Sequence, residues 1–155
     1  MIQRVQSIYL FLASLAIFAL YLFPLLHNVY AGPIPVTITV TGSYVDAPGV
    51  HIMHDHFVAL SAVTAVMGLI PLVIIFLFRN RKQQIALCWS TILVIVGYSF
   101  WMTQVAKSVI GDNPIKTANF GIGILLCPIA IVAMIAAVRA IQRDEKLIKS
   151  ADRLR

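Results

Sequence analysis

Residues 56–78 read HFVALSAVTAVMGLIPLVIIFLF and contain no Asp, Glu, Lys or Arg. Three further stretches share this property, namely residues 7–27, 85–106 and 118–138. Each has about the 20 residues that a helix needs to cross the hydrocarbon core of a bilayer. Helices are the expected form, because a bilayer offers no water to satisfy backbone polar groups. The sequence therefore predicts a single all-α membrane domain, a bundle of four transmembrane helices.

The basic residues lie mostly on one side of these predicted spans. Of the 12 Lys and Arg residues, only Lys107 and Lys116 fall in the connections at 28–55 and 107–117. The others precede the first span, join the second span to the third, or belong to the tail at 139–155. Because basic residues mark the cytoplasmic side, both termini are predicted to be cytoplasmic and the two connections periplasmic. The net charge of +6 thus reflects membrane orientation, and no nucleic acid is expected as a partner.

The predicted spans hold few polar side chains and none that carries a full charge. Ion-coupled transporters and proton relays keep ionisable groups at membrane depth for their function, so these classes are disfavoured. A channel is disfavoured too, because four helices enclose little space and no polar stripe continues along them. The polar side chains are expected to form backbone or interhelical hydrogen bonds; they are Ser14, Ser61, Thr64, Ser90, Thr91, Ser99, Thr103, Gln104 and Asn119.

A short β element is predicted between the first two spans. Residues 35–41 read PVTITVT, and this alternation is typical of a half-buried strand. Gly42 and Ser43 indicate a turn, followed by a return strand at Tyr44 and Val45. A two-stranded, extracytoplasmic ribbon is marginal alone, so it is expected to pack on the helix ends, a third strand or a partner protein. The predicted partner contacts here are Val36, Ile38 and Val40.

Small residues recur in two spans at spacings that allow close contact between helices. In the second span they are Ser61, Ala65 and Gly68, and in the fourth they are Ala133, Ala136, Ala137 and Ala140. The basic tail at 139–155 is predicted to continue the fourth helix into the cytoplasm, because Glu145 precedes Lys149 by the four residues that favour a helical ion pair. This extension is expected to lie near anionic lipid or to bind a cytoplasmic partner.

Histidines are concentrated just before the second span, in the segment HIMHDH at residues 51–56. If this segment were helical, His51, His54 and Asp55 would share one face, and such side chains suit zinc or another divalent metal. The metal ligands predicted on this basis are His27, His51, His54 and His56, with haem held by two of them as a further alternative. The preferred interpretation of these histidines is a position at the membrane interface without a cofactor, because an imidazole is an apolar ring with a polar tip and suits that environment.

The two ends of the chain carry distinctive motifs. Residues 1–10 read MIQRVQSIYL and residues 144–155 read DEKLIKSADRLR. Together with the four spans, they resemble an uncharacterised family of small four-helix inner-membrane proteins of the Bacteroidota, a domain of unknown function. The resemblance covers essentially the whole chain and implies a bacterial inner-membrane location. Polar residues at both ends are the predicted cytoplasmic partner contacts: Gln3, Arg4, Arg143, Asp144, Glu145, Lys149, Asp152 and Arg153.

These observations favour a non-enzymatic accessory or scaffold subunit of a larger inner-membrane complex, such as a protein-export or respiratory complex. Its expected partners are membrane lipid and other integral membrane subunits. The alternative is a periplasm-facing metal- or haem-binding membrane protein that uses the four histidines. Neither a serine nucleophile motif nor paired carboxylates are found in the sequence, so no enzymatic activity is predicted.

Overall fold

The computed structural model describes residues 3–30, 35–47, 50–77, 80–111 and 116–152. Within them, side chains are described for residues 5–30, 35–45, 52–77, 80–111 and 116–147. The elements in chain order are α1 (Gln3–Ala19), β1 (Leu26–Tyr30), β2 (Pro35–Ile38), β3 (Gly42–Ala47), β4 (Val50–His56), α2 (Val58–Phe76), α3 (Arg81–Ile110), the 3-10 helix η1 (Thr117–Asn119) and α4 (Gly123–Asp152).

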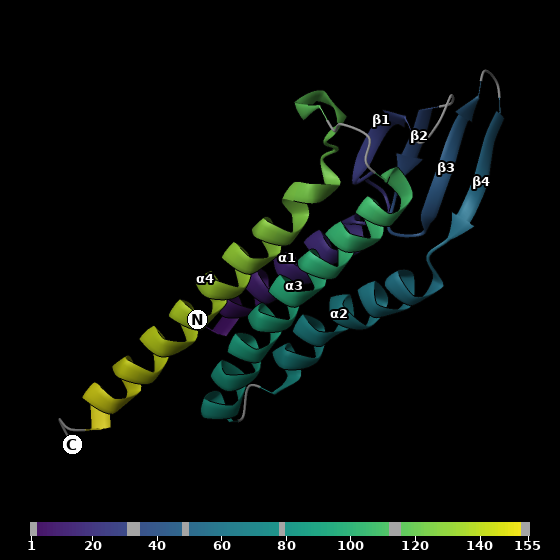
Figure 1. Ribbon diagram of the computed structural model, residues 1–155. Coiled ribbons are helices and arrows are strands. Elements are labelled where there is room, and N and C mark those ends of the chain that lie inside the picture. The colour runs from purple at the N-terminus through teal and green to yellow at the C-terminus, as the bar shows by residue number, and fades with distance from the viewer. Residues whose placement is uncertain (1–2, 31–34, 48–49, 78–79, 112–115, 153–155) are drawn as a thin grey trace.

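The four α-helices form a closed, up-and-down bundle (Figure 1). Each helix packs on its neighbours in the sequence, and α1 also packs on α4, which closes the ring. The core between them is apolar and includes Leu10, Ile17, Ile95, Met134 and Ile141. The helical bundle predicted from the sequence is confirmed.

Among the described residues, three helical segments are long and apolar enough to cross a membrane: Val58–Phe76, Arg81–Ile110 and Gly123–Leu147. Many of their large apolar side chains are exposed, such as Phe76, Leu93 and Val132. Outward-facing apolar side chains are expected of a helix in lipid. Length, composition and exposure are thus all compatible with a membrane protein.

The first helix is shorter than predicted. It ends at Ala19, whereas the apolar run continues to residue 27. Tyr21 and Leu22 close the last turn onto the carbonyls of Phe18 and Ala19, and Pro24 has no N–H to continue the helix. Residues 20–25 form the turn after α1, and the run ends in β1, where Leu26 is buried. A short apolar run suits a helix and a buried strand equally, which explains the wrong boundary.

The β element is larger than the predicted ribbon. Four antiparallel strands form one sheet in the order β1-β2-β3-β4, at one end of the bundle (Figure 1). Its apolar face packs on the last turns of α3, where Val29, Val36 and Ile38 share a buried cluster with Ala106 and Ile110. The ribbon thus gains stability from two further strands and from the helix ends.

Buried hydroxyl groups connect the helices, as predicted for the polar side chains. Ser14 of α1 donates to the carbonyl of Gly68 in α2, at 2.7 Å. Thr64 of α2 donates to its own helix at the carbonyl of Leu60 and lies 2.5 Å from the Tyr98 hydroxyl of α3. Because the single Thr64 proton is used within its helix, Tyr98 is the donor between α2 and α3.

Tyr98→Phe is expected to lower the free energy of unfolding by about 1 kcal/mol, because it removes this hydrogen bond and keeps the ring. Thr64 stays satisfied by its own helix, so no buried donor is orphaned. The measurement is reversible unfolding in mixed detergent micelles. A loss as large as that of a core truncation, about 3 kcal/mol, would contradict this assignment.

Candidate functional site: the α3/α4 groove and the β4 edge

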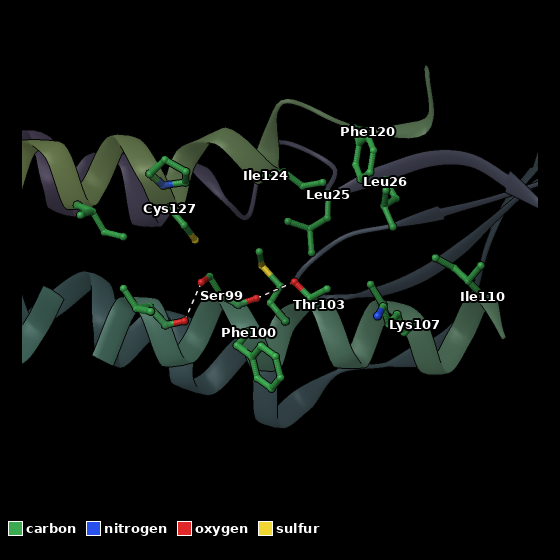
Figure 2. Close-up of a pocket in the computed structure, with 15 residues that line it drawn as sticks. Leu25, Leu26, Ser99, Phe100, Thr103, Lys107, Ile110, Phe120, Ile124 and Cys127 are labelled. Atoms are coloured by element: carbon green, nitrogen blue, oxygen red, sulfur yellow. Dashed lines mark hydrogen bonds between the residues drawn. The ribbon is translucent and has the colours of Figure 1, made fainter. Parts of the chain in front are cut away.

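A groove of about 630 Å³ separates α3 from α4 at the sheet end of the bundle. Figure 2 shows α3 along one side and α4 along the other, with Leu25, Leu26 and Phe120 toward the sheet. The described residues that line it are otherwise Val96, Ser99, Phe100, Met102, Thr103, Ala106, Lys107, Ile110, Ile124, Cys127, Pro128 and Ile131.

The groove presents an almost entirely apolar surface. Its two hydroxyl groups are turned to their own helix, since Ser99 donates to the Val96 carbonyl at 2.7 Å and Thr103 to the Ser99 carbonyl at 2.9 Å (Figure 2). Among the described residues that line the groove, Lys107 is the one charged side chain, and none is a carboxylate or an imidazole. Such a surface suits an apolar occupant, either an acyl chain or a helix of another subunit.

A close backbone junction holds the start of α4 against the beginning of the sheet. The amide of Gly121 donates to the Leu25 carbonyl at 2.8 Å, and that of Gly123 donates to the Pro24 carbonyl at 3.0 Å. Asn119 adds a side-chain contact, because its Nδ2 donates to the carbonyls of His27 and Asn28 at 3.1 and 2.7 Å. This junction, which the sequence did not reveal, closes the sheet end of the α3/α4 groove.

Strand β4 is an edge of the sheet. Among the described residues, no strand pairs with its outer side. The opposite edge, β1, is partly covered, since Leu26 forms a bridge with Phe120. Ile52 of β4 exposes 57% of its surface, and His54, Asp55 and His56 are exposed beside it. Unpaired backbone groups on such an edge can accept a strand from another chain.

The histidine segment is a strand and not the helix assumed for the metal site. It pairs with β3, for example Ser43 with Asp55 and Val45 with Ile52, so the argument from a shared helical face is wrong. Within β4, His54 Nδ1 lies 3.0 Å from Asp55 Oδ2. No group of three His, Cys, Asp or Glu that suits a metal occurs in the described part of the chain.

The fold does not bring His27 close to the histidines of β4. His27 lies on β1, which β2 and β3 separate from His54 and His56 on β4. Three strand spacings amount to roughly 14 Å, whereas ligands of one zinc ion lie about 2 Å from it. The side chain of His51 lies outside the described residues. Metal or haem binding by these histidines stays a prediction.

The predicted partner contacts have different environments. Val36, Ile38 and Val40 are buried, so their side chains form the protein's own core instead of a binding surface. On α4, Arg143 is exposed, Glu145 is half-buried and Asp144 is buried. The other predicted contacts lie outside the residues whose side chains are described: Gln3, Arg4, Lys149, Asp152 and Arg153.

The small residues lie where helices approach each other. The ring of Phe18 packs against Gly68, so closely that a Cβ at Gly68 would come within 2.9 Å of it. The Ser61 carbonyl accepts a hydrogen bond from the Tyr21 hydroxyl at 2.5 Å, while Ala65 is half-buried. On α4, Ala133 and Ala137 are buried, and Ala136 and Ala140 line a second groove beside α1.

The architecture defines a small helical protein of membrane-compatible composition, with an antiparallel sheet at one end of its bundle. More particularly, the chain belongs to the family described as Domain of unknown function (DUF4293), whose model matches residues 2–154. The match spans nearly the whole chain, as the resemblance at the two ends predicted. Neither the curated proteins nor the solved structures gave a match.

Proposed function

We propose that this protein is a non-enzymatic accessory subunit of a larger protein complex in a bacterial inner membrane. The observation that carries the proposal is the exposed edge of β4, which lies at one end of an apolar bundle. An exposed edge strand is an aggregation hazard unless it is protected or used by a partner. Strand addition at β4 is therefore the contact we assign to the neighbouring subunit.

The orientation within the membrane is part of the proposal. Lys107 lies in the last turn of α3 and Lys116 directly before η1, both near the sheet end of the bundle, whereas Arg81 begins α3 at the other end and Arg139 and Arg143 follow the apolar part of α4. The positive-inside rule then supports a cytoplasmic location for both termini and a periplasmic location for the sheet. The same assignment makes β4 available to a periplasmic segment of a partner.

Four membrane passes are proposed, with α1 as the shortest. Its 17 residues span about 25 Å, slightly less than the roughly 30 Å of a bilayer core. The turn after Ala19 ends in Leu22 and Phe23, whose exposed apolar side chains extend the hydrophobic length. A bilayer can thin locally to match a helix slightly shorter than its core.

An origin of the protein in the Bacteroidota remains a prediction.

The test replaces an exposed side chain on β4. Ile52→Lys is expected to reduce the copurifying partner at least about tenfold in mild detergent, because lysine on an edge opposes pairing with another strand. Ile52 is exposed, so the protein itself is expected to keep its fold. The measurement is the stoichiometry of proteins copurified with the tagged chain from its native membrane.

The matched control is Tyr30→Lys. Tyr30 belongs to β1, at the opposite and partly covered edge of the sheet, and exposes 60% of its surface, close to the 57% of Ile52. The control is expected to keep the partner. An equal loss of the copurified partner in both variants would show that the β4 edge is not the contact. A wild-type protein that purifies without any stoichiometric partner would overturn the accessory-subunit proposal.

A further inference from the structure

A second groove, of about 520 Å³, lies between α1 and α4. One wall is formed by Val5 and Tyr9 of α1. The other wall is one face of α4, on which six residues recur at the three- and four-residue spacings of a helix: Val132, Ile135, Ala136, Arg139, Ala140 and Arg143. This α1/α4 groove is separate from the α3/α4 groove and from the sheet.

The α1/α4 groove combines a hollow apolar floor with two cations. Ala136 and Ala140 contribute only methyl groups, which leaves space between the larger side chains around them. Arg139 and Arg143 are one helical turn apart, about 6 Å along the axis, and both are exposed. No carboxylate occurs among the described residues that line the groove. Its electrostatic character is therefore cationic.

The position of the two arginines matches that of a lipid headgroup. The α4 sequence is uncharged from residue 123 to residue 138, and Arg139 is its first charged residue. The arginines thus lie at the boundary of the apolar segment, while Val132 and Ile135 lie within it. A guanidinium group binds phosphate oxygens through paired hydrogen bonds. Basic pockets between membrane helices commonly receive anionic headgroups.

We propose that the α1/α4 groove is a binding site for one anionic phospholipid. Arg139 and Arg143 bind its phosphate, and an acyl chain lies along Val132 and Ile135. The phosphate source is a lipid and not a free anion, because the groove continues from the arginines onto apolar side chains. The site is independent of the β4 edge, so this proposal and the accessory-subunit proposal stand or fall separately.

The test compares two spin-labelled lipids, phosphatidylglycerol and phosphatidylcholine, around the full chain in phosphatidylcholine vesicles. The wild-type protein is expected to immobilise phosphatidylglycerol with a preference of roughly fivefold or more, the attraction associated with one basic side chain near a membrane. Arg139→Gln with Arg143→Gln is expected to abolish the preference. The matched control is Lys82→Gln with Lys146→Gln, which removes two exposed cations outside the groove and should keep it.

Further outcomes decide between charge, shape and protein binding. Ala136→Leu with Ala140→Leu fills the groove without changing charge and is expected to reduce the preference to that of the arginine double variant. Equal association of both lipids with the wild type would overturn the proposal, as would equal losses in the arginine and lysine double variants. Loss of a copurified protein with unchanged lipid preference in the arginine variant would assign the groove to a protein partner instead.

Discussion

Gly121→Ala is expected to lower the free energy of unfolding by about 3 kcal/mol, which is at the upper end of the usual range for a single substitution. A Cβ at this position would lie 2.9 Å from the Pro24 carbonyl carbon and 3.1 Å from the Leu25 oxygen, and closer still to the Pro24 oxygen. These are backbone atoms, so relief requires movement of β1 or α4. The hydrogen bond from the Gly121 amide to Leu25 would be lost with that movement.

Unfolding in mixed detergent micelles measures this effect, and Gly97→Ala is its control. Gly97 is in the interior of α3, where a Cβ would meet no atom within 4 Å. Alanine favours a helix over glycine by about 1 kcal/mol, so Gly97→Ala is expected to leave stability unchanged or raise it. Similar losses at both positions would show that the junction between Gly121 and Leu25 has no special role.

The helices could be predicted from hydropathy because nothing but a helix fits a long uncharged run in a membrane. Hydropathy failed to predict where the first helix ends, because apolar residues after Ala19 are buried without being helical: Leu25 lies in the core of the bundle and Leu26 lies in the cluster between the sheet and α3. For the histidine segment, a helix was considered only as the condition for a shared metal-binding face, and pairing with β3 makes it a strand. Strand pairing depends on residues far apart in the sequence, which a local pattern does not reveal.

The candidate sites were harder to predict than the fold. The Arg139 and Arg143 pair is visible in the sequence as a four-residue spacing on a helix, but its opposite wall comes from α1, at the other end of the chain. The close approach of Gly121 and Gly123 to the Pro24 carbonyl was not predicted, because it joins segments far apart in the sequence that only the structure brings together. The alternating residues from Val36 to Val40 predicted a buried face correctly but left open whether the helix ends, a third strand or a partner protein covers it.

Ala137→Leu is expected to lower the free energy of unfolding by about 2 to 3 kcal/mol. Ala137 has 0% of its surface exposed and belongs to the core of the bundle. Ala137 lies on α4, the helix with which α1 makes its most extensive contact. A larger side chain there must displace neighbouring side chains or separate the helices, and overpacking a dense core costs 1–3 kcal/mol in general. Small residues permit close approach between membrane helices, so this site is sensitive to volume.

Ala136→Leu is the control, because the neighbouring residue is half-buried and lines the α1/α4 groove instead of the core. Its leucine side chain can occupy the groove, so the expected change is within about 0.5 kcal/mol, as for most surface substitutions. Both variants add the same atoms to the same helix and keep the charge. The difference between their unfolding free energies therefore isolates burial, and equal costs would contradict the close contact assigned to Ala137.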